Sequence, residues 1–291
     1  MNLILVTGAN GLVGQVLTKT LRERGHDVLA TGRGQARSPG RYSEMDFTDA
    51  TQVRRLFEAL HPSVVVHSGA MTQVDPCELN PAECRHVNVS GTKNLLEAAR
   101  SHGATFVFLS TDFIFDGRSG PYAEDDAPNP LNVYGRSKLD AETTVKTSGL
   151  SWTIVRTVLV YGNPVTGTRS NLITWTRDNL AAGKSIKVVS DQWRTPTYVE
   201  DLALGIALAI EKEARGVYHI SGRDFLTPYE MAMDTAEALG LDKSLIERVD
   251  ASTFTQAGKR PPRTGFVIGK AMRELGFAPI SFEEGILRTV G

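Results

Sequence analysis

The chain has 291 residues, of which 41% are hydrophobic and 22% charged, and its formal net charge is −1. This composition is typical of a globular protein, and the near-zero charge excludes recruitment of nucleic acid or an anionic membrane by an overall field. The longest apolar run, residues 202–210, is too short to span a bilayer, and the N-terminus lacks the pattern of a signal peptide. We therefore expect a cytoplasmic protein whose partners are neither nucleic acid nor membrane.

The first predicted elements are an apolar strand at residues 3–6 and a helix over residues 12–24, joined by a glycine-rich turn. Glycine allows the backbone to turn tightly and to approach a ligand closely. The N-terminus of the following helix offers free N–H groups and a dipole that favour a diphosphate. We therefore predict that a dinucleotide cofactor binds at Gly8, Asn10, Gly11, Leu12, Val13 and Gly14.

Strands and helices alternate over the first 160 residues. Strands are expected within 25–32, 63–67, 105–110 and 152–160, and helices within 51–60, 88–102 and 134–147. Alternation of this kind indicates βαβ crossovers and a parallel sheet covered on both faces. We predict an α/β fold with a doubly wound, parallel-sheet Rossmann domain at residues 1–160. Residues 161–291 are expected to form a smaller C-terminal α/β substrate lobe, with residues 196–222 returning to the Rossmann core.

The two cysteines, Cys77 and Cys84, lie seven residues apart without a zinc-type pairing nearby. We interpret them as two thiols in a reducing compartment, and neither a disulfide nor a metal site is expected.

A tyrosine and a lysine open the helix that is predicted over residues 134–147. Tyr134 and Lys138 are four residues apart, so they lie on one helix face. A free phenol is a poor acid at neutral pH, and a nearby cation lowers its pKa. Thr111 ends a predicted central strand, at the sheet edge where open α/β sheets bind ligands. We predict that Thr111 and Tyr134 hold one substrate oxygen while a hydride attacks its carbon. The alternatives are a surface tyrosine packed along a lysine stem and a threonine that merely caps the strand end.

The end of the second strand indicates which cofactor is used. A carboxylate there usually binds the ribose 2′-hydroxyl of NAD, whereas an arginine accommodates the 2′-phosphate of NADP. This strand ends at Gly32 and Arg33, and the next acidic residue is Glu44. Because guanidinium groups bind phosphate bidentately, we expect NADP(H) to be preferred, with NAD(H) possible. The alternative is that Arg33 is a solvated loop residue.

Taken in order, these motifs resemble the extended short-chain dehydrogenase/reductases. The resemblance rests on Gly8-x-x-Gly11-x-x-Gly14, Asp46, Ser68-Gly69-Ala70, Asn88, Ser110-Thr111-Asp112 and Tyr134-x-x-x-Lys138. It implies that Asp46 and Phe47 border the adenine. It also implies that Ser68, Gly69, Ala70, Tyr134 and Lys138 contact the cofactor.

Within that superfamily, the chain is most similar to the dTDP-4-dehydrorhamnose reductases. The similarity lies in Ser110-Thr111-Asp112-Phe113-Ile114-Phe115-Asp116-Gly117, Pro121-Tyr122-x-Glu124, Pro130-Leu131-Asn132-Val133-Tyr134-Gly135, Arg156-Thr157, Asp191-Gln192, Pro196-Thr197-Tyr198, Arg260-Pro261 and Leu275-Gly276. It implies reduction of a 4-keto nucleotide sugar, with Tyr134 as proton donor and Thr111 binding the keto oxygen. Lys138 would lower the pKa of Tyr134 and hold the cofactor ribose, and a homodimer is possible.

The candidate substrate residues include positions at which the chain departs from that family. Phe113 stands where the family often has Tyr, Leu159 where it has an aromatic residue, and Arg194 where it has a small one. These positions bear on the identity of the sugar rather than on the reaction. The predicted substrate residues are Asp112, Phe113, Asn171, Gln192, Arg194 and Arg260, the arginines because guanidinium groups suit diphosphate oxygens.

Proteins with three other functions, two enzymatic and one non-catalytic, have similar scaffolds. The 4,6-dehydratases carry Thr-Asp-Glu, and Phe113 replaces that glutamate base here, which argues against dehydration. An epimerase stays open, because it needs little beyond the tyrosine, the lysine and a tightly held cofactor. A non-catalytic NADP-binding subunit, similar to the β subunit of methionine adenosyltransferase, also stays open. The set of Thr111, Tyr134 and Lys138 favours an enzyme.

Overall fold

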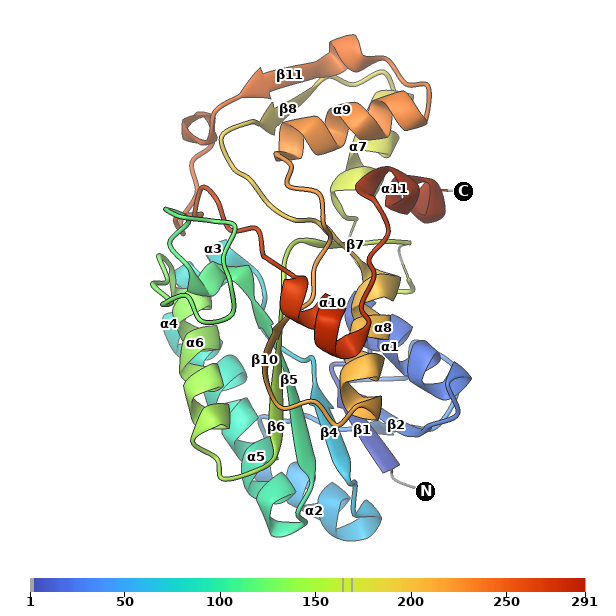
Figure 1. Ribbon diagram of the computed structural model, residues 1–291, viewed down its shortest axis with the longest axis vertical. Helices are drawn as coiled ribbons and strands as arrows, with labels where there is room; N and C mark the ends of the chain where they lie inside the picture. The colour runs from blue at the N-terminus through green and yellow to red at the C-terminus, as the bar shows by residue number, and fades with distance from the viewer. Residues whose placement is uncertain (1–2, 164, 169, 291) are drawn as a thin grey trace.

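The computed structural model describes residues 3–163, 165–168 and 170–290. Its centre is a seven-stranded parallel sheet with the strand order β10-β6-β5-β4-β1-β2-β3 (Figure 1). The strands are β1 (Leu3–Thr7), β2 (Asp27–Gly32), β3 (Tyr42–Glu44), β4 (Val64–His67), β5 (Thr105–Thr111), β6 (Trp152–Thr157) and β10 (Gly216–His219). The order reverses between β1 and β4, the kind of switch point at which open α/β sheets bind ligands. The predicted doubly wound Rossmann fold is confirmed.

The continuous apolar runs of the sequence become central strands that are buried on both faces. All five residues of β1 are buried, and Leu5 pairs with Leu29 on one side and Val65 on the other. A parallel sheet with helices on both faces leaves no solvated side, so the strands need no alternation of polar residues.

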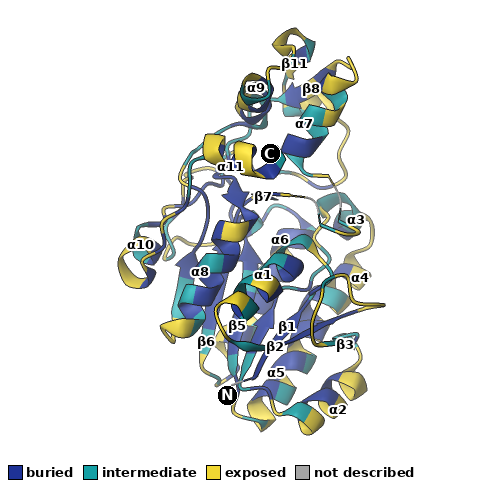
Figure 2. Cartoon of the chain, turned by 90° about the vertical axis from the view of Figure 1, so that its right-hand side faces the viewer, coloured by how far each residue is buried: buried dark blue, intermediate teal, exposed yellow. Residues whose placement is uncertain are grey.

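Helices cover both faces of the sheet (Figures 1 and 2). Helices α1 (Leu12–Glu23), α8 (Val199–Glu211) and α10 (Gly269–Leu275) lie on one side, and α2 (Ala50–Leu60), α5 (Gly91–Ser101) and α6 (Val133–Lys146) on the other. Each side has its own apolar core, one centred on Leu17, Leu21 and Ile206 and the other on Phe57, Leu95 and Phe106. Within the described residues, no helix combines the length and apolar character needed to span a membrane.

The C-terminal part of the chain contributes to two regions. Helices α7 (Leu172–Ala181) and α9 (Pro228–Ala238) pack against the short pair of β8 (Ile186–Val189) and β11 (Ile246–Val249) at one end of the molecule, and α11 (Phe282–Val290) packs on these two helices (Figure 1). A second pair joins β7 (Val160–Tyr161) to β9 (Thr197–Tyr198). By contrast, β10 extends the main sheet beside β6, and α8 packs on α1. The division at residue 160 stays a prediction.

Two expected elements have different bounds in the structure. The helix expected at 88–102 is preceded by α3 (Val74–Leu79) and α4 (Pro81–Arg85), and it begins with a π-helical turn at His86–Ser90. The β-branched stretch 152–160 is not one strand, because Leu159 adopts a left-handed backbone with φ of 35°. This turn ends β6 at Thr157 and sends Val160 into the separate pair with β9. Short 3-10 turns at Asp112–Ile114, Lys243–Leu245 and Ala251–Thr253 complete the fold.

Two histidines are buried within the core. The Nδ1 and Nε2 atoms of His67 lie 2.7 Å and 3.1 Å from the hydroxyls of Thr7 and Thr92. Burial, with a smaller contribution from Lys138, lowers the pKa of His67 to about 3. His219 stacks on a phenylalanine ring, and burial lowers its pKa to about 3 as well. Both imidazoles are therefore neutral in the folded protein at pH 7.

These two histidines predict loss of stability in acid. Each takes up a proton near pH 6.5 when the chain is unfolded but only near pH 3 when it is folded, so the unfolded state binds more protons in between. We expect the free energy of unfolding to fall by about 1.4 kcal/mol per pH unit for each histidine as pH drops from about 6.5 towards 3. Urea unfolding at several pH values measures this slope. His67→Gln, which cannot titrate, should show a shallower slope, and an unchanged slope would contradict the assignment.

Candidate active site

The glycine turn after β1 packs against the turn after β4. Gly8 has a left-handed backbone with φ of 70°, and a Cβ there would lie 2.6 Å from the Cα of Gly69. A Cβ on Gly14 would lie 2.3 Å from the carbonyl oxygen of Gly8, so α1 starts in direct contact with the turn. Gly11 faces outward and is exposed. Two glycines are therefore required by packing, and the third leaves the backbone open to a ligand.

The N-terminus of α1 has the properties of an anion site. Gly11 is its N-cap, and among the described residues no side chain caps it, whereas Asp49 caps the neighbouring α2. The first N–H groups of α1 thus remain available, and the helix dipole favours negative charge beside them. A dinucleotide diphosphate fits this position.

Asn10 shapes the turn. Its Nδ2 donates to the carbonyl oxygens of Arg33 and Gln35, at 3.0 Å and 3.1 Å, and to the hydroxyl of Tyr42 at 3.1 Å. Its Oδ1 accepts from the backbone N–H of Arg37 at 3.1 Å. The Asn10 side chain therefore joins the glycine turn to the loop between β2 and β3, where the sequence predicts the cofactor 2′ position.

Two arginines lie on that loop. Arg33 is exposed directly after β2, as the predicted 2′-phosphate site requires. Sequence reasoning missed Arg37, whose Nη1 donates to the carbonyl oxygen of Gly167 at 2.9 Å. Arg37 thereby bridges the loop between β2 and β3 and the segment after β7. The loop that carries Arg37 is polar and rich in glycine, so its sequence has no hydrophobic periodicity that could distinguish Arg37 from the other polar residues.

Phe47 forms a wall beside the turn after β4. Its ring lies so close to Gly69 and Gly91 that a Cβ on either would come within 2.6 Å of a ring carbon. The ring also meets His67 edge-on, with centroids 4.9 Å apart. Asp46 caps its own turn by accepting from the backbone N–H of Thr48 at 2.9 Å. The adenine contacts implied for Asp46 and Phe47 stay predictions.

The proposed catalytic residues gather at the carboxyl end of β5. Asn132 caps α6 by accepting from the backbone N–H of Gly135 at 2.8 Å, which sets the start of the helix beside this strand. Lys138 is buried, and its Nζ donates to the carbonyl oxygen of Leu109 on β5 at 2.7 Å. Tyr134, one turn earlier, is buried with its phenol next to the Thr111 hydroxyl.

Burial dominates the electrostatics of this group. It raises the pKa of Tyr134, and the nearby Thr111 hydroxyl offsets part of the increase. It also lowers the pKa of Lys138 to about 7, against the opposing effect of the Glu142 carboxylate. The expected lowering of the Tyr134 pKa is therefore not met in this structure. A protonated phenol is nevertheless the form that a proton donor needs.

A polar and thiol layer underlies Tyr134. Ser137 donates to the Tyr134 carbonyl oxygen at 2.7 Å, and Asn88 donates to the Ser137 hydroxyl at 2.9 Å. Cys77 and Cys84 are free, buried thiols in the apolar cluster that contains the Tyr134 ring. Asn88 lies in the π-helical turn, a distortion that is frequent at functional sites. Sequence reasoning named Asn88 and the two cysteines but did not place them under Tyr134, because periodicity carries no signal for a π-turn.

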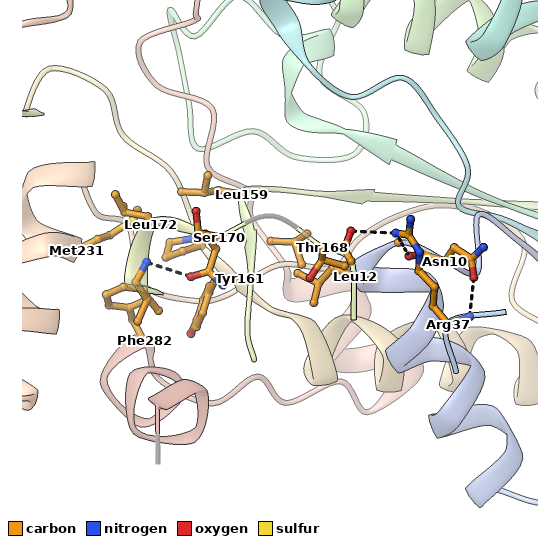
Figure 3. Close-up of a pocket in the computed structure, with 16 residues that line it drawn as sticks. Asn10, Leu12, Arg37, Leu159, Tyr161, Thr168, Ser170, Leu172, Met231 and Phe282 are labelled. Atoms are coloured by element: carbon orange, nitrogen blue, oxygen red, sulfur yellow. Dashed lines mark hydrogen bonds between the residues drawn. The ribbon is translucent and has the colours of Figure 1, made fainter. Parts of the chain in front are cut away.

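A cavity of about 540 Å³ separates the glycine turn from the C-terminal helices (Figure 3). Its walls include Asn10, Leu12, Arg37, Leu159, Tyr161, Thr168, Ser170, Asn171, Leu172, Met231 and Phe282. Leu159 is 43% exposed and lines the cavity in its left-handed turn. Asn171 also lines it, but its Oδ1 caps α7 and its Nδ2 donates to the carbonyl oxygen of Gly162 at 2.6 Å.

Arg194 and Arg260 are committed to contacts within the protein. Arg194 is 5% exposed, and its Nη2 donates to the carbonyl oxygen of Pro261 at 2.8 Å. Gln192 Oε1 lies 3.4 Å from the same nitrogen. Arg260 forms a two-point ion pair with Asp75, with 2.8 Å between Nη2 and Oδ2. Because these guanidinium N–H groups already donate to acceptors within the protein, the geometry does not favour the predicted binding of a substrate diphosphate by Arg194 and Arg260.

A buried ion pair supports α6 from behind. Glu142 follows Lys138 by one turn, and its Oε1 and Oε2 accept from Nε and Nη2 of Arg156 at 3.0 Å and 2.8 Å. Both side chains are at most 2% exposed. Arg156 lies on β6, so the pair joins α6 to the sheet and holds the helix that carries Tyr134 and Lys138.

The parallel sheet, the glycine turn and the Thr111, Tyr134 and Lys138 group define an extended short-chain dehydrogenase/reductase. This class comprises NAD(P)-dependent oxidoreductases. The chain belongs to the family described as RmlD substrate binding domain, which it matches over residues 1–291.

Individual relatives are similar over nearly the whole chain. A probable low-salt glycan biosynthesis reductase of Haloferax volcanii is 31% identical, with 97% of this chain and 95% of the relative covered. The methionine adenosyltransferase 2 subunit beta of Bos taurus is also 31% identical, over 94% of this chain and 82% of its own. The dTDP-4-dehydrorhamnose reductase of Bacillus anthracis, solved in complex with NADP, superimposes with a TM-score of 0.88 at 29% identity and covers 99% of both chains.

Proposed function

We propose that the chain is an NAD(P)H-dependent reductase of a 4-keto nucleotide sugar. The observation that carries this proposal is the convergence of Thr111, Tyr134 and Lys138 at the carboxyl end of β5. The N-terminus of α1, which no side chain of the described residues caps, borders the cavity of about 540 Å³ and offers a place for a dinucleotide. Relatives that are named as a glycan biosynthesis reductase and a dTDP-4-dehydrorhamnose reductase support the same reaction class.

The residues of the site divide the reaction into a hydride and a proton transfer. A reduced nicotinamide supplies the hydride when it is bound. Tyr134 gives its phenolic proton to the carbonyl oxygen as negative charge develops there, so that the ketone becomes an alcohol. Thr111 holds the same oxygen. Lys138 lies on α6 one turn after Tyr134, and its Nζ is anchored on the carbonyl oxygen of Leu109. In this proposal it holds the cofactor ribose and favours reprotonation of Tyr134.

Cofactor preference follows from the loop after β2. Arg33 is exposed there, and the Glu44 carboxylate at the end of β3 accepts from the backbone N–H of Gly34 at 2.9 Å. We infer that NADP(H) binds in preference to NAD(H). The Arg33 guanidinium can form a charge-assisted hydrogen bond with the anionic 2′-phosphate of NADP, whereas NAD offers only a neutral 2′-hydroxyl. One such bond contributes about 1.5–3 kcal/mol, which corresponds to a tenfold to hundredfold preference.

Replacing Arg33 by Asp should reverse that preference. The new carboxylate repels the 2′-phosphate and offers the 2′-hydroxyl an acceptor. Titration calorimetry with NADPH and NADH measures both dissociation constants. Arg54→Asp, the same charge change on the exposed face of α2, is the matched control and should leave both constants unchanged. Equal constants for the two cofactors in the unmodified protein would remove the argument.

The function itself is tested by supplying dTDP-, UDP- and GDP-linked 4-keto sugars and following the absorbance of the reduced cofactor. Turnover of at least one establishes the reductase. Interconversion of sugars without net consumption of the cofactor would instead establish an epimerase. Tight NADP(H) binding without turnover, together with a co-purifying protein, would favour a regulatory subunit, the alternative that the 31% identical methionine adenosyltransferase subunit supports.

Leu159 bears on the sugar that is accepted. It stands on the cavity wall in place of the aromatic side chain that is typical of the resembling reductases, so it leaves more space and no stacking surface. We therefore infer an altered sugar preference rather than a loss of hydride transfer. A cytoplasmic location and a homodimer stay predictions.

A further inference from the structure

Asp112 is a buried carboxylate directly beside the catalytic end of β5. It is 2% exposed, and its Oδ1 lies 3.1 Å from the hydroxyl of Thr111, which donates to it. A threonine hydroxyl has a single proton. A Thr111 proton that is given to Asp112 cannot at the same time be given to a substrate carbonyl oxygen. The charge on Asp112 therefore controls what Thr111 does.

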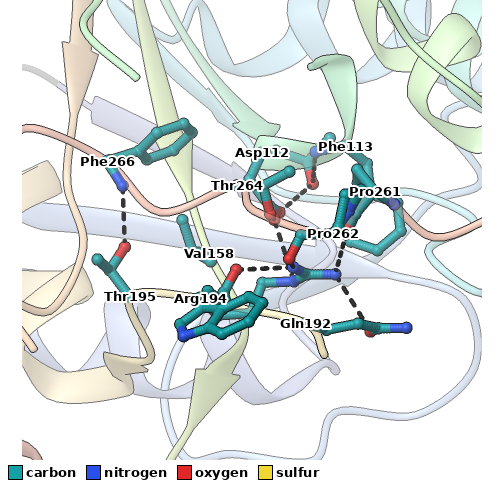
Figure 4. Close-up of polar contacts among 12 residues, drawn as sticks. Asp112, Phe113, Val158, Gln192, Arg194, Thr195, Pro261, Pro262, Thr264 and Phe266 are labelled. Carbon is teal, nitrogen blue, oxygen red and sulfur yellow. Dashed lines mark hydrogen bonds and ion pairs between the residues drawn. The ribbon is translucent and has the colours of Figure 1, made fainter. Parts of the chain in front are cut away.

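The second oxygen of this carboxylate faces two donors from distant parts of the chain (Figure 4). Thr264 donates its hydroxyl proton to Oδ2. The Nε atom of Arg194 lies 3.7 Å from the same oxygen, and both side chains of this ion pair are at most 5% exposed. Arginine has no acceptor atom, so Asp112 accepts on this side.

Arg194 is itself held firmly in place. Its Nη1 donates to the carbonyl oxygen of Trp193 at 2.7 Å and its Nη2 to that of Pro261 at 2.8 Å. Its guanidinium also lies over the ring of Phe113, 5.7 Å from the centroid. These contacts fix the cation behind Asp112 and away from solvent, a place from which it acts on the carboxylate and not on a substrate phosphate.

We propose that Arg194 is a positioning residue, which acts on the reaction through Asp112 by orienting the Thr111 hydroxyl. Arg194 and Thr264 draw negative charge towards Oδ2, so Oδ1 competes less strongly for the Thr111 proton. That proton is then free to follow the substrate carbonyl oxygen as its charge grows during hydride transfer. The inference rests on the proposed function for the identity of the substrate oxygen.

The charged and titratable groups that face Asp112 are Arg194, from the segment before β9, and Tyr134, from α6. Burial raises the pKa of Asp112, and Arg194 counteracts the increase. Without Arg194, the ionised Asp112 would hold the Thr111 proton more tightly, and the pKa of Asp112 would rise further. Protonation of Asp112 would then release Thr111 again. The loss of kcat caused by removing Arg194 should therefore be small at low pH, where Asp112 is protonated, and larger at high pH, where it is ionised.

The experiment compares Arg194→Met and Arg194→Lys with the unmodified enzyme on the best 4-keto sugar found. We expect kcat of Arg194→Met to fall roughly tenfold to hundredfold, while KM for the nucleotide sugar and the NADPH dissociation constant stay within about twofold. Arg194→Lys, which keeps the charge, should restore most of kcat. The ratio of variant to unmodified kcat should approach one at low pH and decrease as pH rises through the Asp112 ionisation.

If Arg194 had only a structural role, the ratio of variant to unmodified kcat would be the same at every pH, and that result overturns the proposal. A raised KM with unchanged kcat also overturns it, because it would place Arg194 on the substrate. Should Arg194→Met fail to fold, Thr264→Val removes the other donor to Oδ2, and its deficit must show the same pH dependence.

A second measurement is independent of turnover. The carboxyl carbon of Asp112, assigned by its loss in Asp112→Asn, is titrated by NMR in the unmodified protein and in Arg194→Met, or in Thr264→Val if the former does not fold. Its midpoint should move upward when the donor is weakened or removed, and an equal midpoint overturns the proposal. If no sugar is turned over at all, the proposed function fails, whereas this titration still decides whether Arg194 controls the Asp112 charge.

Discussion

Replacing Tyr134 by Phe should abolish turnover of the 4-keto sugar while the cofactor still binds. The ring keeps its place in the apolar cluster with Cys77 and Cys84, so the packing under α6 is preserved. The substitution removes the phenolic proton, and a positioned acid contributes a factor of ~10²–10⁴ in rate. Steady-state kinetics measure kcat, and calorimetry measures the NADPH dissociation constant, which should change little.

The matched control for this prediction is Tyr218→Phe. Its hydroxyl donates to Glu274 at 2.7 Å, on β10 at the far edge of the sheet from the glycine turn. Its removal should affect stability slightly and leave kcat unchanged. If Tyr134→Phe retained at least half of the unmodified rate, Tyr134 would not be the proton donor.

Replacing Glu142 by Gln should cause the largest loss of stability among single changes near the site. Arg156 would be left as an uncompensated charge in the core, and breaking a buried ion pair in this way costs about 3–5 kcal/mol. Urea unfolding monitored by circular dichroism measures this free energy. The change also removes the carboxylate that supports the charged form of Lys138, so weaker cofactor binding should accompany it.

Two comparisons make the Glu142 prediction specific. Glu58→Gln breaks an exposed pair with Arg54 on α2, in which both side chains are at least 60% exposed, and should cost less than about 1 kcal/mol. The double replacement of Glu142 and Arg156 by Met should recover much of the loss, because no lone charge remains. A cost for Glu142→Gln as small as that for Glu58→Gln would show that the pair does not hold α6 to the sheet.

The sequence identified the features that depend on neighbours along the chain. The apolar runs of β1, β4 and β5, the three glycines after β1 and the four-residue spacing of Tyr134 and Lys138 each follow from local backbone geometry. Parallel strands that alternate with helices then have few arrangements, because the crossovers are right-handed. The sheet and the place of the glycine turn could for this reason be predicted without coordinates.

Tertiary structure decided which polar side chains face a ligand and which face the protein. Arg194 has a sequence context typical of a loop, yet the segment at Pro261 and Thr264 folds over it and converts it into the buried partner of Asp112. Arg37 shows the reverse case, since its contacts with Asn10 and Gly167 place it at the cavity.

Glu142 and Arg156 illustrate the same limit in the core. Both are charged residues that a sequence places at the surface, but they lie on two elements that pack face to face and neutralise each other there. Their roles depend on desolvation and on a partner that lies 14 residues away on another element, which periodicity does not encode. The sequence alone thus determined the scaffold and predicted the candidate reacting groups. The fold decided which charges surround those groups, because the cost of burying a charge depends on what the folded chain brings beside it.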